Sequence, residues 1–231
     1  MKKMIMMFLM MVGVMAHASS ADYNVRDYGA KGDGKTLDHQ AINAAIDSCV
    51  AHGGGRVVVP AGTYLCGSIR MKSHVELHLS AGAKILAAPA SMKAYDEAEH
   101  WEGPAYQDGG HTYFKNSLIY AIGQEHVSIT GRGMIDGQGL TKKDTEKGGV
   151  VNGGNIGTGD KAIAFKLCRN ILIRDVTIYR GGHFAIILTG CELGTVDNVT
   201  IDTNRDGFDI DCCKYLSVSN CKINTPRDDA L

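Results

Sequence analysis

Three consecutive stretches of the chain repeat one pattern: AIAFKLCRNILIRDVTI (162–178), AIILTGCELGTVDNVTI (185–201) and GFDIDCCKYLSVSNCKI (207–223). The second is offset from the first by 23 residues, and the third from the second by 22. Apolar residues share a column in all three copies: Ile163, Ile186 and Phe208; Phe165, Leu188 and Ile210; Cys168, Cys191 and Cys213; Ile173, Val196 and Val218; Val176, Val199 and Cys221; Ile178, Ile201 and Ile223. HVSITGRGMI (126–135) and HVELHLSAGAKI (74–85) are fainter, earlier copies.

A unit of this length holds two or three short strands and cannot bury its apolar face alone. Stacked on copies of itself it buries a continuous core. Each strand then pairs in parallel with its counterpart one coil away, at about 4.8 Å. Leucine-rich repeats have a similar period, but their Leu-x-x-Leu-x-Leu-x-x-Asn pattern is absent. The pattern therefore predicts an all-β fold, a parallel β-helix solenoid.

One amphipathic helix is predicted near the start of the solenoid. Residues 37–52 place Ala41, Ile42, Ala45, Ile46 and Cys49 on one face, with Thr36 or Asp38 as N-cap and Gly53 just after the end. The first coil of a solenoid exposes strand edges and an apolar end, so we expect this helix to cap them. Before it, 23–26 is expected to be a strand and 29–34 a loop. Residues 91–115 and 141–160 are expected to be long excursions.

The start of the chain indicates export. Lys2 and Lys3 precede an apolar run, and Ala16-His17-Ala18 forms a cleavage site, so residues 1–18 are predicted to be a signal peptide and 19–231 the mature chain. A secreted or periplasmic location follows, with no membrane association of the mature form.

The net charge of −1 and the absence of a basic block argue against a nucleic-acid partner. The seven cysteines are an odd number, so at least one stays free, and no metal or cofactor motif is found.

Two acidic stretches lie about one repeat apart near the end: NRDGFDID (204–211) and PRDDAL (226–231). One period after Gly207, its column is held by Ala230, so Asp229 falls in the column of Asp206, with Asp228 beside it. Stacked residues lie about 5 Å apart at the backbone. Three carboxyls this close repel one another, so at least one proton is held more tightly than in free Asp. Such a cluster suits glycoside hydrolysis, which needs one carboxylic acid and one carboxylate. Asp209 and Asp211 are expected to serve turn geometry or a solvent face.

These residues resemble the polygalacturonase family, glycoside hydrolase family 28, whose pattern is Asn-Thr-Asp-Gly followed by Gly-Asp-Asp. The opening, from YNVRDYGAKGDGKTLDHQAINAAIDSC (23–49) to GGGRVVVPAGTYLCGSI (53–69), is similar to the amino-terminal cap of pectin-degrading β-helix enzymes. The resemblance implies a right-handed parallel β-helix that hydrolyses α-galacturonic acid linkages with inversion. Its partner would be a pectic polysaccharide or oligogalacturonide, bound by an enzyme that is monomeric when full-length.

The resemblance also implies roles for individual residues. Asp228 would be the general acid, Asp206 and Asp229 would activate water, and Asn204 would orient the site. Arg205 and Arg227 replace the family's Thr and Gly. They would pair with the acids, bind a uronate carboxylate or lie on the surface. His183, one coil before Asp206, is a further candidate for the cleft lining.

The family also carries a His-Gly and an Arg-x-Lys motif further along, beyond Leu231. We therefore expect the chain to be a carboxy-terminally truncated piece, inactive alone and prone to associate through its open last coil. A monomeric 231-residue chain that cleaves polygalacturonate would contradict this. The Arg-containing variant of the motifs also leaves open a rhamnogalacturonan-directed or exo-acting member. A pectate lyase and a non-catalytic carbohydrate-binding β-helix are the alternatives of another class.

Overall fold

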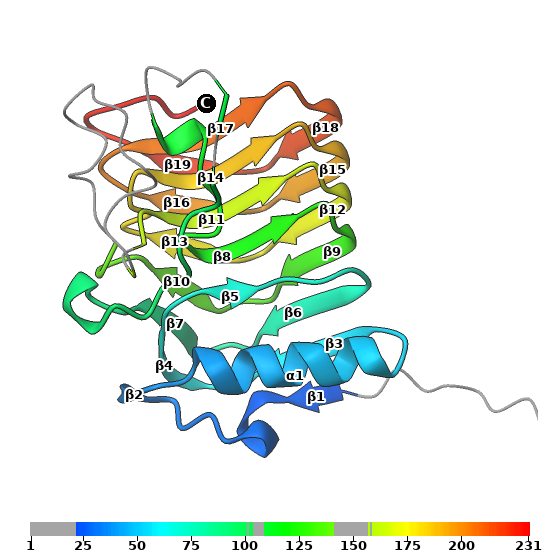
Figure 1. Ribbon diagram of the computed structural model, residues 1–231. Coiled ribbons are helices and arrows are strands. Elements are labelled where there is room, and N and C mark those ends of the chain that lie inside the picture. Colours follow the sequence, from blue (N-terminus) through cyan, green and yellow to red (C-terminus); the bar gives the residue numbers. More distant parts are fainter. Residues whose placement is uncertain (1–21, 101, 104–108, 141–156, 158) are drawn as a thin grey trace, which may run out of the picture.

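The computed structural model describes residues 22–100, 102–103, 109–140, 157 and 159–231, which wind into a right-handed parallel β-helix with three sheets (Figure 1). Sheet A holds β1 (Asp22–Asn24), β3 (Gly55–Val59), β6 (Val75–Leu79), β9 (Glu125–Thr130), β12 (Arg169–Arg174), β15 (Glu192–Asp197) and β18 (Lys214–Ser219). Sheet B holds β2 (Asp33–Leu37), β4 (Gly62–Cys66), β7 (Ala83–Ala87), β10 (Met134–Asp136), β13 (Thr177–Tyr179), β16 (Thr200–Asp202) and β19 (Lys222–Asn224). Sheet C holds β5 (Ile69–Arg70), β8 (Ser117–Ile122), β11 (Lys161–Lys166), β14 (Phe184–Thr189) and β17 (Asp206–Asp211).

The predicted repeat register is confirmed strand by strand. Ile163 pairs with Ile186, and Ile186 pairs in turn with Phe208. The two fainter copies also stack, since β6 pairs with β9 and β7 with β10. Their partners lie more than one repeat apart in the sequence because the segment between β7 and β8 is looped out of the coil.

The apolar columns point inward and form one continuous core along the solenoid axis. Ile163, Ile186 and Phe208 are each almost fully buried. Burying one such side chain stabilises the fold by roughly 1.5–3 kcal/mol. No single coil encloses these side chains, so the stability of each coil depends on its neighbours.

Asp and Asn residues occupy a tight turn between sheets A and B in three successive coils. Asp175, Asn198 and Asn220 have φ angles of 67°, 52° and 55°, in the left-handed region that Asn and Asp tolerate best. The Asn198 side chain donates a hydrogen bond to Asp175 Oδ1 at 2.9 Å. This side-chain ladder fixes the corner of the coil and shows a structural use of acidic residues in this fold.

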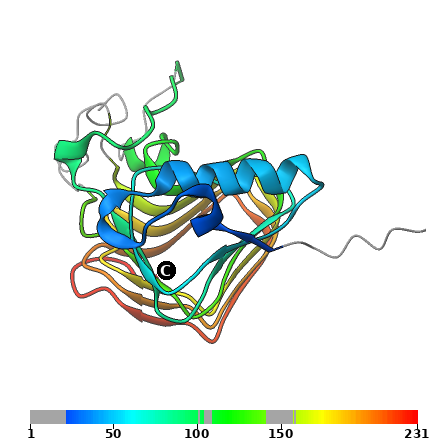
Figure 2. The ribbon, with the colours of Figure 1, turned by 90° about the horizontal axis from the view of Figure 1, so that it is seen from below.

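The predicted capping helix is present as α1 (His39–Ala51). In the first coil, α1 follows β1 and β2 and takes the place of a sheet C strand. It lies at the lower end of the coils (Figures 1 and 2). The buried Asn43 side chain donates to the Ser68 carbonyl at 2.9 Å and accepts from the Arg70 N–H at 2.8 Å. The helix therefore satisfies backbone groups at the open edge of β5.

The amino-terminal segment differs in detail from the prediction. β1 ends at Asn24, whose side chain accepts a hydrogen bond from the Arg26 N–H at 3.0 Å and caps the short 3₁₀ helix η1 (Val25–Tyr28). The predicted N-cap Asp38 is confirmed in position, but its carboxylate accepts from the Lys31 and Gly32 N–H groups at 2.7 and 2.9 Å. It ties the preceding loop to the helix and makes no side-chain cap hydrogen bond.

The described parts of the excursion between β7 and β8, residues 88–100, 102–103 and 109–116, lie over the outer face of sheet C (Figure 1). They contain two short 3₁₀ helices, η2 (Ala90–Met92) and η3 (Gly109–His111). Phe114 of this excursion packs on Ala164, Phe184 and Ile187 in a small apolar cluster separate from the core. The excursion therefore covers strands β11 and β14 from outside.

The described residues also bear on the predictions of membrane association and of free cysteines. The predicted signal peptide lies outside the described residues. Within them, no helix is both long and apolar enough to cross a membrane. All seven cysteines are described, and every one carries a free thiol.

Candidate active site

The candidate site lies where the last described coil returns to sheet C. Asp206 is the first residue of β17, and Asp228 and Asp229 follow β19 in the next turn. The Gly207 N–H donates to the Asp229 carbonyl at 2.9 Å, and the Phe208 N–H donates to the Ala230 carbonyl at 3.1 Å. Residues 229–230 therefore run beside β17 in the register that the repeat predicts. A Cβ at Gly207 would lie 2.8 Å from the Ala230 oxygen, so glycine permits this close approach.

The structure brings the three predicted carboxylates together. One oxygen from each of Asp206, Asp228 and Asp229 lies within 4.8 Å of the others. Asp206 is half-buried and the other two are exposed. Burial, and then the negative charge of Asp228, raise the pKa of Asp206 above its ordinary value. The cluster therefore retains a proton to higher pH than an isolated Asp would.

Arg205 lies against this cluster. Its Nε is 3.0 Å from Asp228 Oδ2, and its Nη2 is 3.7 Å from Asp206 Oδ2. Of the three possibilities for the two arginines, Arg205 thus pairs with the acids and offsets part of their repulsion. Arg227 is exposed and lies outside the lining of the neighbouring pocket.

A pocket of about 410 Å³ opens beside the carboxylates, large enough to hold part of a sugar chain. Its lining combines the charged cluster with residues of β14, β17 and the excursion: His111, Phe184, Arg205, Asp206, Phe208, Asp209, Ile210, Asp228, Asp229 and Leu231. Acidic groups dominate this lining, with Arg205 and His111 as the basic partners.

The sequence analysis did not identify a second polar cluster, formed by His111, Asp209 and Asp211. His111 Nδ1 lies 2.8 Å from Asp211 Oδ2, and its Nε2 lies 3.5 Å from Asp209 Oδ2. Burial raises the pKa of Asp209 to about 6, although His111 opposes the shift. Both acids lie on the outer face of β17, as one of the two expectations had it, but this face contacts the excursion instead of solvent. The only available signal was their i, i+2 spacing on one strand face.

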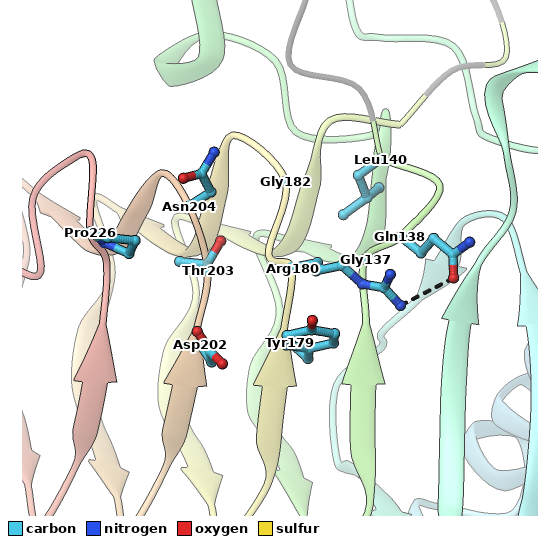
Figure 3. A pocket seen from close by; sticks show the side chains of 10 residues that line it. All are labelled: Gly137, Gln138, Leu140, Tyr179, Arg180, Gly182, Asp202, Thr203, Asn204 and Pro226. Carbon is cyan, nitrogen blue, oxygen red and sulfur yellow. Dashed lines mark hydrogen bonds between the residues drawn. The ribbon is translucent and has the colours of Figure 1, made fainter.

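Two other predicted residues lie away from this pocket. In contrast to the prediction, His183 does not line it, because its side chain is fully buried. Its ring packs edge-on against Phe184, with the ring centres 4.4 Å apart. Asn204 lines a second pocket, together with Pro226, around the corner of the coil (Figure 3).

Both clusters also have the spacing of possible metal ligands, since the donor atoms within each lie within 4.8 Å of one another. In the first cluster Arg205 already lies among the carboxylates, whereas in the second His111 is itself one of the three possible ligands. The arrangement can bind a proton, orient a water molecule and hold a polar substrate. These are the elements of acid–base catalysis.

Comparison with known proteins identifies the family of the chain. Residues 23–228 match the family model described as rhamnogalacturonase A/epimerase, pectate lyase-like. An exopolygalacturonase from Platanus acerifolia is 25% identical over 221 residues, which are 91% of this chain and 52% of that protein. An exo-poly-alpha-D-galacturonosidase from Dickeya chrysanthemi is 35% identical over 136 residues, 56% of this chain and 21% of that protein.

Comparison with solved structures also finds an exopolygalacturonase. A hyperthermoactive exopolygalacturonase from Thermotoga maritima superposes with a TM-score of 0.73 at 28% identity, over 89% of this chain and 52% of that one. The chain spans about half the length, or less, of these relatives. The two exopolygalacturonases match about nine tenths of this chain and the exo-poly-alpha-D-galacturonosidase 56% of it, and each match covers only part of the relative.

Proposed function

The chain belongs to the rhamnogalacturonase A/epimerase, pectate lyase-like family, and from this membership we propose that it hydrolyses α-galacturonic acid linkages of pectin. Its similarity to polygalacturonases, which its motifs indicated, supports this choice within the family. The observation that carries the proposal is the cluster of Asp206, Asp228 and Asp229 beside a pocket of sugar size.

In the proposed reaction, Asp228 gives its proton to the glycosidic oxygen as the bond from that oxygen to the anomeric carbon breaks. A water molecule held by Asp206 and Asp229 attacks the same carbon from the opposite face and gives its proton to one of these carboxylates. Protons balance, because one is released to the leaving group and one is taken from water. The product sugar has the inverted configuration.

The charges around the cluster supply the proton that the reaction needs. Three ionised carboxyls within 4.8 Å are unfavourable, so the cluster holds one proton ready for donation. The raised pKa of Asp206 is a property of interacting groups, which titrate in steps that belong to the cluster. Arg205, at 3.0 Å from Asp228, stabilises the carboxylate left after proton donation. Asn204 and Arg227, outside the pocket lining, keep their proposed substrate-binding roles only toward parts of the polymer beyond the reacting sugar.

A specific observation favours attack from a chain end. The excursion covers the outer face of sheet C, and Phe114 fills the space over β11 and β14 below the carboxylates. His111 lines the pocket and contacts Asp209 and Asp211 of β17. A polymer lying along sheet C would meet this wall, so the pocket suits a terminal sugar. The exo-acting relatives from Platanus acerifolia and Thermotoga maritima support the same proposal.

Product analysis on homogalacturonan and on rhamnogalacturonan tests the proposal. The assay uses the 231-residue chain and any longer form of the protein that contains it. We expect saturated galacturonic acid released from chain ends of homogalacturonan. An unsaturated product that absorbs in the ultraviolet and disappears with a chelator would show a lyase instead. Cleavage of rhamnogalacturonan alone would identify rhamnogalacturonan, and not homogalacturonan, as the substrate.

A further inference from the structure

A second pocket of about 360 Å³ lies at the carboxyl ends of four neighbouring strands of sheet B, β10, β13, β16 and β19 (Figure 3). It is lined by Gly137, Gln138, Leu140, Tyr179, Arg180, Gly182, Asp202, Thr203, Asn204 and Pro226. Asn204 and Pro226 each stand two residues before a carboxylate of the candidate active site. Two residues of extended chain span about 7 Å, so the two pockets flank the same turns.

The cation of this pocket is already neutralised. Arg180 donates from Nε to Asp136 Oδ1 at 2.9 Å and from Nη2 to Asp136 Oδ2 at 2.6 Å, in a bidentate pair. Its guanidinium also lies 4.6 Å from the centre of the Tyr179 ring. Asp136 is almost fully buried, so Arg180 balances a charge that water does not solvate. This arginine is therefore held in place and is a poor partner for a further anion.

Asp202 is the other charged residue of the lining. It is exposed and accepts a hydrogen bond from Asn224 Nδ2 at 2.9 Å, a neutral partner. Neither Asp136 nor Lys84, which lies 4.0 Å from Asp136, is part of the lining, and their charges cancel. Arg180 is engaged by Asp136, whereas the partner of Asp202 is neutral, so a carboxylate ligand placed beside Asp202 would be repelled.

The groups that remain available are those that bind hydroxyls. Gln138 accepts from Arg180 through its oxygen and keeps its amide N–H groups for a ligand. The half-buried Asn204 amide offers both a donor and an acceptor, and Figure 3 shows it directed away from the strand ends. The Tyr179 ring, 39% exposed, adds apolar surface with Leu140 and Pro226. Convergent polar groups beside apolar surface are typical of small-ligand sites.

We propose that this pocket is an accessory sugar site that binds a neutral pyranose of the pectic substrate, as a branch or a backbone residue. The inference rests on the proposed function for the identity of the polymer. It adds that a neutral sugar next to, or carried by, the galacturonate sugars strengthens binding of the substrate. Asp202 rejects the uronate carboxylate, and Tyr179 supports the ring of the neutral sugar.

Two ligands that differ only at C6 test the proposal: methyl α-D-galactopyranoside and methyl α-D-galactopyranosiduronate. Each is titrated into the 231-residue chain and followed by NMR. We expect the galactoside to shift amide signals of 137–140, 179–182 and 202–204, and to bind at least five-fold more tightly than the uronate. Equal or tighter binding of the uronate, or shifts confined to other residues, would overturn the proposal.

Variants separate the roles of the lining residues. Tyr179→Ala should weaken galactoside binding about ten-fold, whereas Tyr215→Ala, at a 77% exposed tyrosine on sheet A, should leave it unchanged. Asp202→Asn should reduce the preference for the galactoside several-fold by admitting the uronate. Circular dichroism checks the fold of each variant. Unchanged binding in both folded variants, Tyr179→Ala and Asp202→Asn, would also overturn the proposal.

The proposed function fails independently of this site. Asp228→Asn should leave the galactoside titration as in the unmodified chain, because that carboxylate does not line this pocket. Galactoside binding without any hydrolysis of pectin would retain the accessory site and reject the hydrolase. Hydrolysis without galactoside binding would do the reverse.

Discussion

His111 Nδ1 and Asp211 Oδ2 lie 2.8 Å apart, which joins residues one hundred positions apart in the sequence. The bond fastens η3 of the excursion to the outer face of β17, the strand that begins with Asp206. The other ring nitrogen lies 3.5 Å from Asp209. A protonated imidazole can donate to both carboxylates, so one side chain holds the wall of the pocket beside the candidate catalytic cluster.

Replacing this histidine should loosen the excursion. We expect His111→Ala to lower the free energy of unfolding by about 1–2 kcal/mol, the range for a hydrogen bond to a charged partner at a partly exposed site. Hydrogen exchange at 112–116 should become faster. His100→Ala, at an exposed histidine of the same excursion, is the matched control and should change neither quantity. Unchanged exchange in His111→Ala would mean that Phe114 packing alone holds the segment.

Asp209 should make stability depend on pH. Its pKa in the folded chain is raised to about 6 by burial, above about 3.9 in the unfolded chain. A group whose pKa is raised in the folded chain contributes stability that is fully present below its unfolded pKa, here pH 3.9, and is lost as the pH rises through 6. The free energy of unfolding should therefore fall less between pH 5 and pH 7 for Asp209→Asn than for the unmodified chain.

Urea unfolding at pH 5 and pH 7 measures this difference. Asp33→Asn is the control, because backbone hydrogen bonds from Thr36 and Lys35 lower the pKa of Asp33 to about 2. Asp33 stays ionised across that interval, so its removal should cost the same at both pH values. Parallel pH profiles for Asp209→Asn and the unmodified chain would contradict the predicted role of Asp209.

Under the proposed function, Asp228→Asn should remove hydrolysis and keep the fold. General acid catalysis contributes about 10²–10⁴-fold, so the rate should fall by that factor in whichever form of the enzyme is active. The circular dichroism spectrum should not change, because Asp228 is exposed. Asp197→Asn, in a ladder with Ser219 and Asn220 on sheet A, should retain full activity. Full activity of Asp228→Asn would reject its role as the acid.

The stereochemistry of the product tests the roles of the other two carboxylates. Inversion at an α-linkage should give the β-anomer first, as followed by proton NMR during the first minutes of reaction. The carboxylate oxygens lie within 4.8 Å, closer than the roughly 6.5–9.5 Å separation typical of inverting pairs. The α-anomer as first product would therefore assign one of the carboxylates as a nucleophile.

A buried ion pair beneath the site should matter for stability. Lys161 Nζ lies 2.7 Å from Asp160 Oδ1, and the lysine side chain is fully buried. Breaking such a pair by removing one partner costs about 3–5 kcal/mol, so Lys161→Met should be strongly destabilising. Chemical unfolding should show the double variant Lys161→Met with Asp160→Asn to be more stable than the single one. A single variant as stable as the unmodified chain would show that water reaches Asp160.

Most of the fold could be predicted from the chain because a β-helix is nearly one-dimensional. The columns through Ile163 and Ile178 fix the register, and a register fixed at one strand fixes its neighbours. The same register placed Asp206 beside Asp229. The spacing of apolar residues also located α1, although its buried Asn43, which binds the edge of β5, gave no periodic signal.

The repeat pattern was enough to predict the solenoid and the acidic cluster, because repeats turn positions along the chain into neighbours in space, and the spacing of apolar residues predicted the capping helix. The position of the excursion, and with it the contact of His111 with Asp209 and Asp211, could be seen only in the folded chain. The same is true of the burial of His183 and of the pairing of Arg180 with Asp136. These contacts join segments outside the repeat or depend on side-chain direction, and neither follows from a period of 22 or 23 residues.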